Sequence, residues 1–387
     1  MKQNVYLPNY KDGSIVNLMS SIGKAFKLKT KYKELKLLDS KDIKKYKNII
    51  LIVIDGLGYE YLMKKDESFL KNNLKGSMTS IFLPTTVCAV TSFLTGVAPQ
   101  QHAYTGWFMY LKEIGIVSKI LPFTPRIGNE VFSEQGVKVS DVLSSKGIFS
   151  KIKAKSYYIN PEEIVDSDFS RFLSKNAKRI GCRNLNSFFE KIKKAVDSKG
   201  KKYIHAYWNK FDSVAHKKGV NSKEAGNYFK KLDKGIKSLV KSINKTNTLL
   251  MVTSDHGFID TPLNKIIWIE KHPKLEECLS LPLCGEGRVA YCYIKPSKTK
   301  DFEKYVKIKL KKYCWMYKSK DLIKRNYFGL FKPNPKLFNR VGDYVLICKE
   351  NYIIKDKLVG EKKTKHIGHH GGVSKNEMLI PLVVVDV

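Results

Sequence analysis

Residues 48–54 form the run NIILIVI, which is apolar after its first position and consists mainly of β-branched side chains. A strand without alternation of polar and apolar residues is buried on both faces, which is typical of a central strand in a parallel sheet. The run ends at Asp55 and Gly56, so a carboxylate lies at the carboxyl end of the predicted strand. This feature predicts an α/β fold with helices on both faces of the sheet.

Two further runs resemble the first one. Residues 248–253 (TLLMVT) end at Ser254, and residues 202–208 (KYIHAYW) precede a polar segment. Between the strands, residues 187–196 and 225–243 carry apolar side chains at intervals of three and four, with lysines in the remaining positions, which predicts amphipathic helices. Alternating strands and helices predict a sheet with a helical layer on each face, a three-layer αβα sandwich whose central sheet is mostly parallel.

The pattern changes at about residue 263. Short Tyr- and Lys-rich strands such as 288–294 and 344–348, with one amphipathic helix near 300–313, predict a smaller α+β cap over residues 263–361. This cap is inserted in the core domain.

The chain returns to the core after the predicted cap. Residues 378–387 (MLIPLVVVDV) have the composition of a strand of the main sheet. We therefore expect residues 1–262 and 362–387 to form one core domain.

The chain is strongly basic, with 71 Lys and Arg against 36 Asp and Glu and a formal net charge of +35. A positive field attracts anionic substrates and nucleic acid. The lysines, however, are spread along the whole chain and arginine is scarce, which favours a general lysine bias on solvated faces.

The seven cysteines form no CxxC pair, and their odd number and irregular spacing do not describe a disulfide framework. The first residues show no secretory signal, and no stretch is apolar for the roughly 20 residues of a membrane helix. We expect a cytoplasmic protein with no membrane partner.

Carboxylates and imidazoles follow the predicted strands, and in an open α/β sheet such residues converge outside the carboxyl ends of the strands. Asp212 and His216 are four residues apart, so one helical turn places both on the same face. Mixed carboxylate and imidazole ligation suits Zn²⁺ best, with Mn²⁺ or Fe²⁺ as alternatives. The candidate metal ligands are Asp55, Asp212, His216, Asp255, His256 and His370.

Thr86 is the candidate nucleophile, because its segment (IFLPTT) precedes a predicted helix. A hydroxyl at a helix start lies beside free N–H groups and a positive dipole end, which favour a phosphate. The alternatives are that Thr85 or Thr86 only caps this helix, and that Cys88 is the nucleophile. Cys88 has no positioned histidine in its own segment, which favours a packing role.

The other histidines are assigned structural roles. His205, inside a strand, is predicted to be a hydrogen-bonded core residue, and His272 and His366 to be loop or surface residues. His369, next to a candidate ligand, is placed in a supporting position.

The chain resembles the alkaline phosphatase superfamily, and specifically its nucleotide pyrophosphatase/phosphodiesterase branch. The motifs that carry the likeness are IVIDGLG, LPTTVCAVTSFLTGVAPQQHA, WNKFDSVAHKKG, VTSDHGF and GHHGG, in the order of that family. The resemblance implies an alkaline phosphatase-like catalytic core and two metal ions. One ion would take Asp212, His216 and His370, and the other Asp55, Asp255, His256 and the Thr86 oxygen.

The resemblance implies hydrolysis of a phosphodiester or pyrophosphate through a covalent phospho-threonine on Thr86, with the two ions clamping the attacking and leaving oxygens. A phosphomonoesterase or phosphonate hydrolase of the same superfamily is the first alternative. A basic nucleic-acid-binding protein with an inactive hydrolase fold is the second. The chain has His102 and Ala103 where the family often has His-Gly, and no substrate-binding residue is assigned, although we expect a small phosphodiester or nucleotide.

Overall fold

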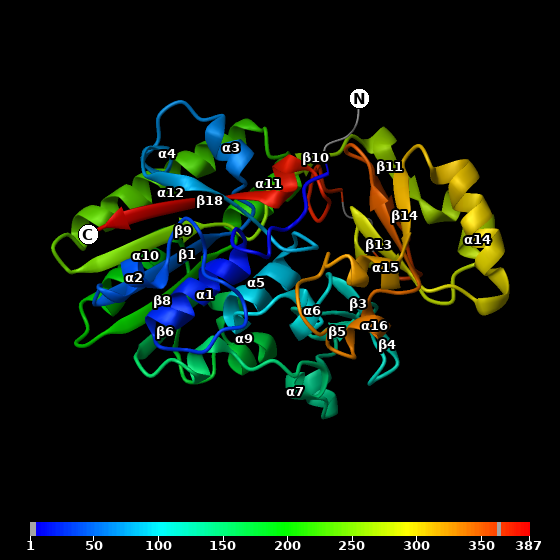
Figure 1. Ribbon diagram of the computed structural model, residues 1–387. Helices are drawn as coiled ribbons and strands as arrows, with labels where there is room; N and C mark the ends of the chain where they lie inside the picture. Colours follow the sequence, from blue (N-terminus) through cyan, green and yellow to red (C-terminus); the bar gives the residue numbers. More distant parts are fainter. Residues whose placement is uncertain (1–4, 362–364) are drawn as a thin grey trace.

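The computed structural model describes residues 5–361 and 365–387, and it contains two large sheets that lie side by side (Figure 1). In the first sheet every strand pairing is parallel except the two made by β18 (Leu379–Asp386), so the predicted mostly parallel sheet is confirmed. Its strands, in spatial order, are β2 (Leu74–Thr79), β18 (Leu379–Asp386), β9 (Thr248–Thr253), β1 (Asn48–Ile54), β8 (Lys202–Trp208), β6 (Lys155–Pro161) and β7 (Lys178–Cys182).

The three central strands begin and end where the sequence predicts. Asn48 of β1 pairs with Lys202 of β8 and with Thr248 of β9, so the three parallel strands start at one level. They also finish close together, because Ile54 is paired with Trp208. Every polar segment that follows one of these strands therefore emerges at the same edge of the sheet.

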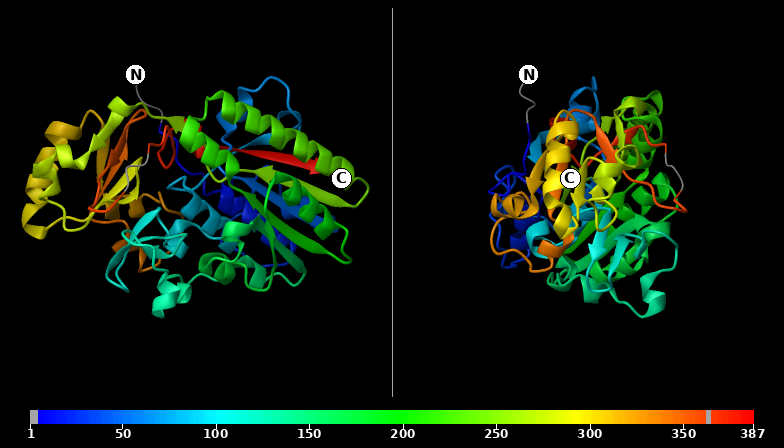
Figure 2. Two further views of the ribbon diagram at one scale, coloured as in Figure 1. Left: turned by 180° about the vertical axis from the view of Figure 1, so that it is seen from behind. Right: turned by 90° about the vertical axis from the view of Figure 1, so that its right-hand side faces the viewer.

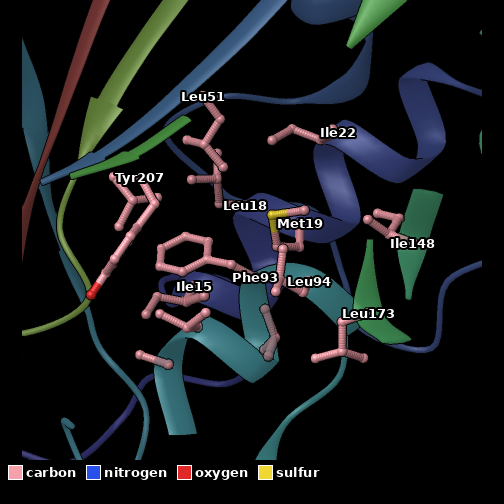
Figure 3. Close-up of a cluster of buried hydrophobic side chains, with 14 of the residues drawn as sticks. Ile15, Leu18, Met19, Ile22, Leu51, Phe93, Leu94, Ile148, Leu173 and Tyr207 are labelled. Atoms are coloured by element: carbon pink, nitrogen blue, oxygen red, sulfur yellow. The ribbon is translucent and has the colours of Figure 1, made fainter. Parts of the chain in front are cut away.

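Alternate side chains of β1 enter two separate cores. Leu51 packs with α1 (Ile15–Ala25) and α5 (Thr86–Thr95) on one face, and Figure 3 shows it above Leu18 and Phe93. Ile52 packs on the other face with α10 (Leu185–Val196) and α12 (Lys223–Ser242), the green helices in front in the left view of Figure 2. The buried central strand and the helical layer on each face confirm the α/β prediction.

Two helices start earlier than their apolar pattern suggests. The side chain of Asn184 accepts a hydrogen bond from Ser187 N, so α10 begins at Leu185. Likewise Ser222 caps α12 by accepting from Ala225 N. The caps, which satisfy N–H groups that lack an intrahelical partner, set these starts.

The second sheet is antiparallel and forms the wall opposite the carboxyl ends of the first sheet. One face is covered by α14 (Thr299–Tyr305), which continues as a π-helix over Val306–Leu310. The strands, in spatial order, are β14 (Cys314–Lys318), β15 (Tyr344–Cys348), β13 (Val289–Cys292), β12 (Cys284–Glu286), β3 (Phe108–Leu111), β4 (Ile116–Lys119) and β5 (Thr124–Pro125).

The second sheet extends beyond the predicted cap. Strands β3, β4 and β5 belong to the segment 108–125, which the sequence assigns to the core, and they join the sheet where Phe108 pairs with Gly285. That residues 263–361 form a separate cap domain remains a prediction. The sheet of this region is completed by residues 108–125, which lie far upstream in the sequence. Pairing over that distance has no local sequence signal.

Two further features concern the cysteines and the apolar character of the helices. All seven cysteines lie in the described residues, where they are buried and free of disulfide bonds. Among the described helices, none combines the length and the apolar character that crossing a membrane requires.

We predict that the buried His205 makes stability depend on pH. It stacks on Tyr158 in the core, its Nδ1 has no hydrogen-bond partner among the described residues, and burial lowers its pKa to about 3. The His205 imidazole therefore becomes protonated near pH 6.5 in the unfolded chain but stays neutral in the folded chain. Stability consequently falls as the pH decreases below 6.5. The free energy of unfolding should fall by about 2 kcal/mol from this group between about pH 7 and pH 5.

The variant His205→Phe should remove this contribution, which urea titrations at both pH values would measure. Tyr158→Phe is the matched control, because it alters the same stack without a group that titrates in this range. An identical pH slope in the wild type and in His205→Phe would contradict the prediction.

Candidate active site

The first cluster consists of Asp212, His216 and His370, whose potential ligand atoms all lie within 4.8 Å of one another. Asp212 and His216 lie on α11 (Lys210–Lys218), which follows β8, and their Oδ1 and Nε2 atoms are 3.4 Å apart. His370 follows β17 (Gly368–His369), and its Nε2 lies 3.2 Å from Nε2 of His216. The structure thus brings together three residues that the sequence places far apart.

The second cluster consists of Asp55, Asp255 and His256, which lie just beyond β1 and β9. Nε2 of His256 is 3.3 Å from Oδ1 of Asp55 and 3.4 Å from Oδ2 of Asp255. The same nitrogen lies 3.3 Å from Oγ1 of Thr86. All of the predicted site residues therefore lie in the two clusters or beside them.

The two clusters adjoin each other through their imidazoles. The rings of His256 and His370 are stacked with centroids 3.7 Å apart and an interplanar angle of 16°. One continuous site therefore holds three carboxylates, three imidazoles and one hydroxyl.

The ring nitrogens that face away from the site fix the tautomers. Nδ1 of His216 lies 2.8 Å from the carbonyl oxygen of Gly368, and Nδ1 of His256 lies 3.1 Å from that of Gly257. A carbonyl oxygen only accepts, so each Nδ1 carries the proton and each Nε2 turns a lone pair to the site. His370 follows the same rule, with its Nδ1 3.3 Å from the carbonyl oxygen of Pro84.

Three carboxylate oxygens in the site have no hydrogen-bond partner among the described residues: Oδ1 of Asp55, Oδ1 of Asp212 and Oδ2 of Asp255. Burial raises the pKa of Asp55 to about 6, and burial with the Asp55 charge raises the pKa of Asp255 to about 7. Burial, with the charges of Asp55 and Asp255, also holds the pKa of Asp212 well above its usual range. Such unpaired oxygens beside imidazole lone pairs fit the ligand set of a divalent cation.

The other carboxylate oxygen of Asp55 and that of Asp255 are held in place by protein donors. The Tyr207 hydroxyl, seen at the edge of the core in Figure 3, donates to Oδ2 of Asp55. Oδ1 of Asp255 accepts from the backbone N–H groups of Gly56 and His256, each at 3.0 Å. These supports orient the free oxygens toward the site.

Thr86 is the first residue of α5, and its side chain does not cap the helix. The N-cap is Thr85, which makes no side-chain capping bond and instead donates its hydroxyl to Oε1 of Glu286 at 2.6 Å. The Thr86 hydroxyl is left facing His256, as the nucleophile prediction requires. Cys88 is fully buried in the core, which agrees with the packing role.

A cavity of about 830 Å³ opens over this site. The floor includes Thr86, Asp212, His216 and His370, while the walls come largely from the second sheet and its flanks, including Trp107, Glu286 and Lys355. Its volume is in the range of small-molecule binding sites.

Two cavity residues, His366 and Glu286, have no predicted role in the site, and His369 has only a predicted supporting position. His366, predicted to be a loop residue, has its ring 4.7 Å from that of His216, and the buried His369 directs Nε2 toward the backbone oxygen of His366 at 3.3 Å. Glu286 lies between two glycines with no strand-end pattern to mark it. By contrast His272 bonds Tyr305, away from the cavity.

Comparison with known proteins supports this description. The family model for type I phosphodiesterase / nucleotide pyrophosphatase matches residues 49–373. No curated protein sequence matches the chain.

Several solved structures share the fold. Murine ectonucleotide pyrophosphatase/phosphodiesterase 5 is similar with a TM-score of 0.65 and 17% identity, over 86% of this chain and 87% of that one. The human protein of the same name gives 0.65 and 16%, over 87% of each chain. Phosphonoacetate hydrolase from Sinorhizobium meliloti 1021, in complex with phosphonoformate, gives 0.62 and 16%, over 87% of this chain and 89% of that one.

We predict that the effect of Asp212→Asn on stability changes sign with metal. Without metal the amide replaces a half-buried carboxyl group whose Oδ1 has no described partner, so the variant should be more stable than the wild type by about 1–3 kcal/mol. With Zn²⁺ at a hundred times its dissociation constant or more, the wild type should gain about 3 kcal/mol or more, and the variant much less.

Thermal unfolding with a chelator and with added Zn²⁺ would measure both effects. Asp66→Asn, at an exposed position, is the control for the loss of one charge. Equal gains from Zn²⁺ in the wild type and Asp212→Asn would overturn the assignment of this ligand.

Proposed function

Since the chain belongs to the type I phosphodiesterase / nucleotide pyrophosphatase family, whose members are phosphoric ester hydrolases, we propose that it cleaves phosphodiester or pyrophosphate bonds through a phospho-threonine on Thr86. One observation carries the proposal. Oγ1 of Thr86 lies 3.3 Å from Nε2 of His256, in a cavity that also includes the Asp212 cluster.

The two clusters would each hold one divalent cation, with Zn²⁺ as the first candidate and Mn²⁺ or Fe²⁺ as alternatives. Asp212, His216 and His370 would bind one ion, and Asp55, Asp255, His256 and Thr86 the other. Such ions, when bound, lower the pKa of a hydroxyl and stabilise charge on a leaving oxygen.

The chain itself positions the nucleophile. Thr86 lies at the N-terminus of α5, where free N–H groups and the helix dipole favour the negative phosphoryl group. As the bond between Oγ1 and phosphorus forms, the bond to the leaving oxygen breaks. Water then cleaves the phospho-threonine, which releases a phosphate monoester and restores the hydroxyl.

A related structure supports the proposal. This murine structure is an inactive threonine-to-alanine variant in complex with AMP, which is consistent with a nucleophilic threonine and a nucleotide ligand in that protein.

The cysteines bear on where the protein is located. In this chain, seven buried free thiols support a reducing compartment such as the cytoplasm as its location.

Glu286 favours a diester over a monoester. Its carboxylate lies beside the nucleophile, bonded to Thr85, and also accepts from the Trp107 N–H at 3.2 Å. A monoester brings two negative charges to this carboxylate, whereas a diester brings one, so repulsion is larger for the monoester.

We predict that Thr86→Ala abolishes turnover and leaves the metal content unchanged. Removing a nucleophile should lower kcat by at least about 1,000-fold, because the covalent step is lost. Hydrolysis of bis(4-nitrophenyl) phosphate and elemental analysis of the purified protein would test both parts. Thr86→Ser should keep measurable activity, and a wild-type rate in Thr86→Ala would show that another group attacks phosphorus.

We also predict that Glu286→Gln reduces the preference for diesters. The ratio of kcat/KM for bis(4-nitrophenyl) phosphate to that for 4-nitrophenyl phosphate should fall by about 10-fold, since about 1.4 kcal/mol of repulsion is removed. Glu276→Gln, exposed on α13 (Pro273–Glu276), is the matched control. A ratio that stays at the wild-type value would refute this role of Glu286, and a large wild-type preference for the monoester would refute the proposed substrate class.

A further inference from the structure

The cavity has a cationic side that the proposed chemistry does not use. The cationic side chains on its described lining are Lys119, Arg126, Lys355 and Lys357. Lys357 is exposed at the rim. The amine of Lys119 donates to the backbone oxygen of Gly128 at 3.0 Å.

The charge of Arg126 is already neutralised within the cavity wall. Its guanidinium donates to both oxygens of Asp356, at 2.7 and 3.1 Å, and to both oxygens of Glu361, at 2.8 and 2.9 Å. It also lies 4.5 Å over the ring of Phe108. Arg126 therefore joins β5 to the chain around residues 356–361 and has little charge left for a ligand.

Lys355 differs from Lys119 and Arg126 because its amine makes no hydrogen bond or ion pair with a described residue, and from Lys357 because its side chain is not fully exposed. It is the last residue of β16 (Ile353–Lys355) and pairs with Trp268 of β11 (Ile266–Trp268). The side chain is only partly exposed, and burial lowers its pKa. An ammonium group withdrawn from water without a partner is unfavourable, and an anion in the cavity would supply the missing partner.

The charge of Lys355 acts on residues beside the reacting centre. Burial raises the pKa of Glu286 and the Lys355 charge opposes that rise, while burial and Lys355 together lower the pKa of His369. The amine is thus electrostatically coupled to groups beside the nucleophile and the first cluster. It belongs to the two-stranded sheet of β11 and β16, however, and not to either ligand cluster.

We propose that Lys355 binds a second anionic group of the substrate, a carboxylate or phosphate-type oxygen separate from the phosphoryl group that Thr86 attacks. The inference rests on the proposed function and narrows its substrates to phosphodiesters or pyrophosphates with a further negative charge. The cavity of about 830 Å³ has room for a molecule that spans both positions, with Trp107 and Trp268 along its wall.

Three 4-nitrophenyl phosphodiesters would test the proposal, because they share the reacting phosphorus and the leaving group. Their second ester is ethyl, 2-carboxyethyl or 2-phosphonoethyl, so they differ only in the distal group and its charge. In the wild type kcat/KM should be higher for a charged ester than for the ethyl ester, and the better of the two charged esters identifies the anion. In Lys355→Met this advantage should shrink by about 10- to 100-fold, mainly through KM.

Lys274→Met is the matched control, because Lys274 is exposed on α13 and its loss changes the net charge equally. The control should keep the full advantage of the charged esters. A wild-type enzyme that hydrolyses all three esters equally well, or a Lys355→Met variant that keeps the advantage, would overturn the inference while leaving the hydrolase assignment intact.

Binding separates this inference from the proposed function. Calorimetric titration of Thr86→Ala with the charged esters should show affinity that falls by about 10-fold or more when Lys355→Met is added. If the wild type hydrolyses none of the esters, the proposed function fails, but loss of binding on removal of Lys355 would still support an anion site. Equal affinity with and without Lys355 would overturn the proposed anion site, whether or not the wild type hydrolyses the esters.

Discussion

The architecture of the site depends on an electrostatic conflict inside the protein. Buried carboxylate oxygens of Asp55, Asp212 and Asp255 have no donor among the described residues, and they lie next to imidazole nitrogens whose lone pairs also face inward. Like charges and lone pairs at such distances repel one another in a low-dielectric interior. A divalent cation in each cluster would resolve the conflict, whereas protons on the carboxylates would resolve only part of it. The folded sheet therefore provides the rigidity that keeps these groups together.

That rigidity comes from the alignment of three strand ends. The pairing of β1 with β8 and β9 brings Asp55, Asp255 and the start of α11 to one edge, and the two cores fix the sheet from both faces. Supports from the same elements, such as the Tyr207 hydroxyl on Asp55, orient individual oxygens. The geometry of the two clusters is thus a direct consequence of strand register, and a shift of one residue would point their side chains to the wrong face.

The strand ends could be predicted from the sequence because their pattern is local. The runs 48–54, 202–208 and 248–253 are mostly apolar and are followed by polar residues, so their limits are evident from the local pattern. Residues that approach the site through pairing between distant segments carry no such signal. Phe108 meets Gly285 only in the folded chain, and this contact draws Trp107 and Glu286 to the cavity. His366 and His369, although next to His370, follow no strand-end or helical spacing that would distinguish cavity residues from loop residues.

Chemistry and substrate choice consequently come from different parts of the chain. In the proposed mechanism α5 provides the nucleophile and the segments after the strands of the first sheet provide metal ligands, whereas the cavity wall carries Glu286 on β12 and Lys355 on β16. The negative Glu286 and the positive Lys355 act on different parts of a ligand. Repulsion by Glu286 disfavours extra negative charge on the reacting group beside Thr86, whereas attraction by Lys355 favours a negative charge on a distant part of the ligand. A substitution in the second sheet can therefore change which ester is cleaved without disturbing the strand ends on which the reaction depends.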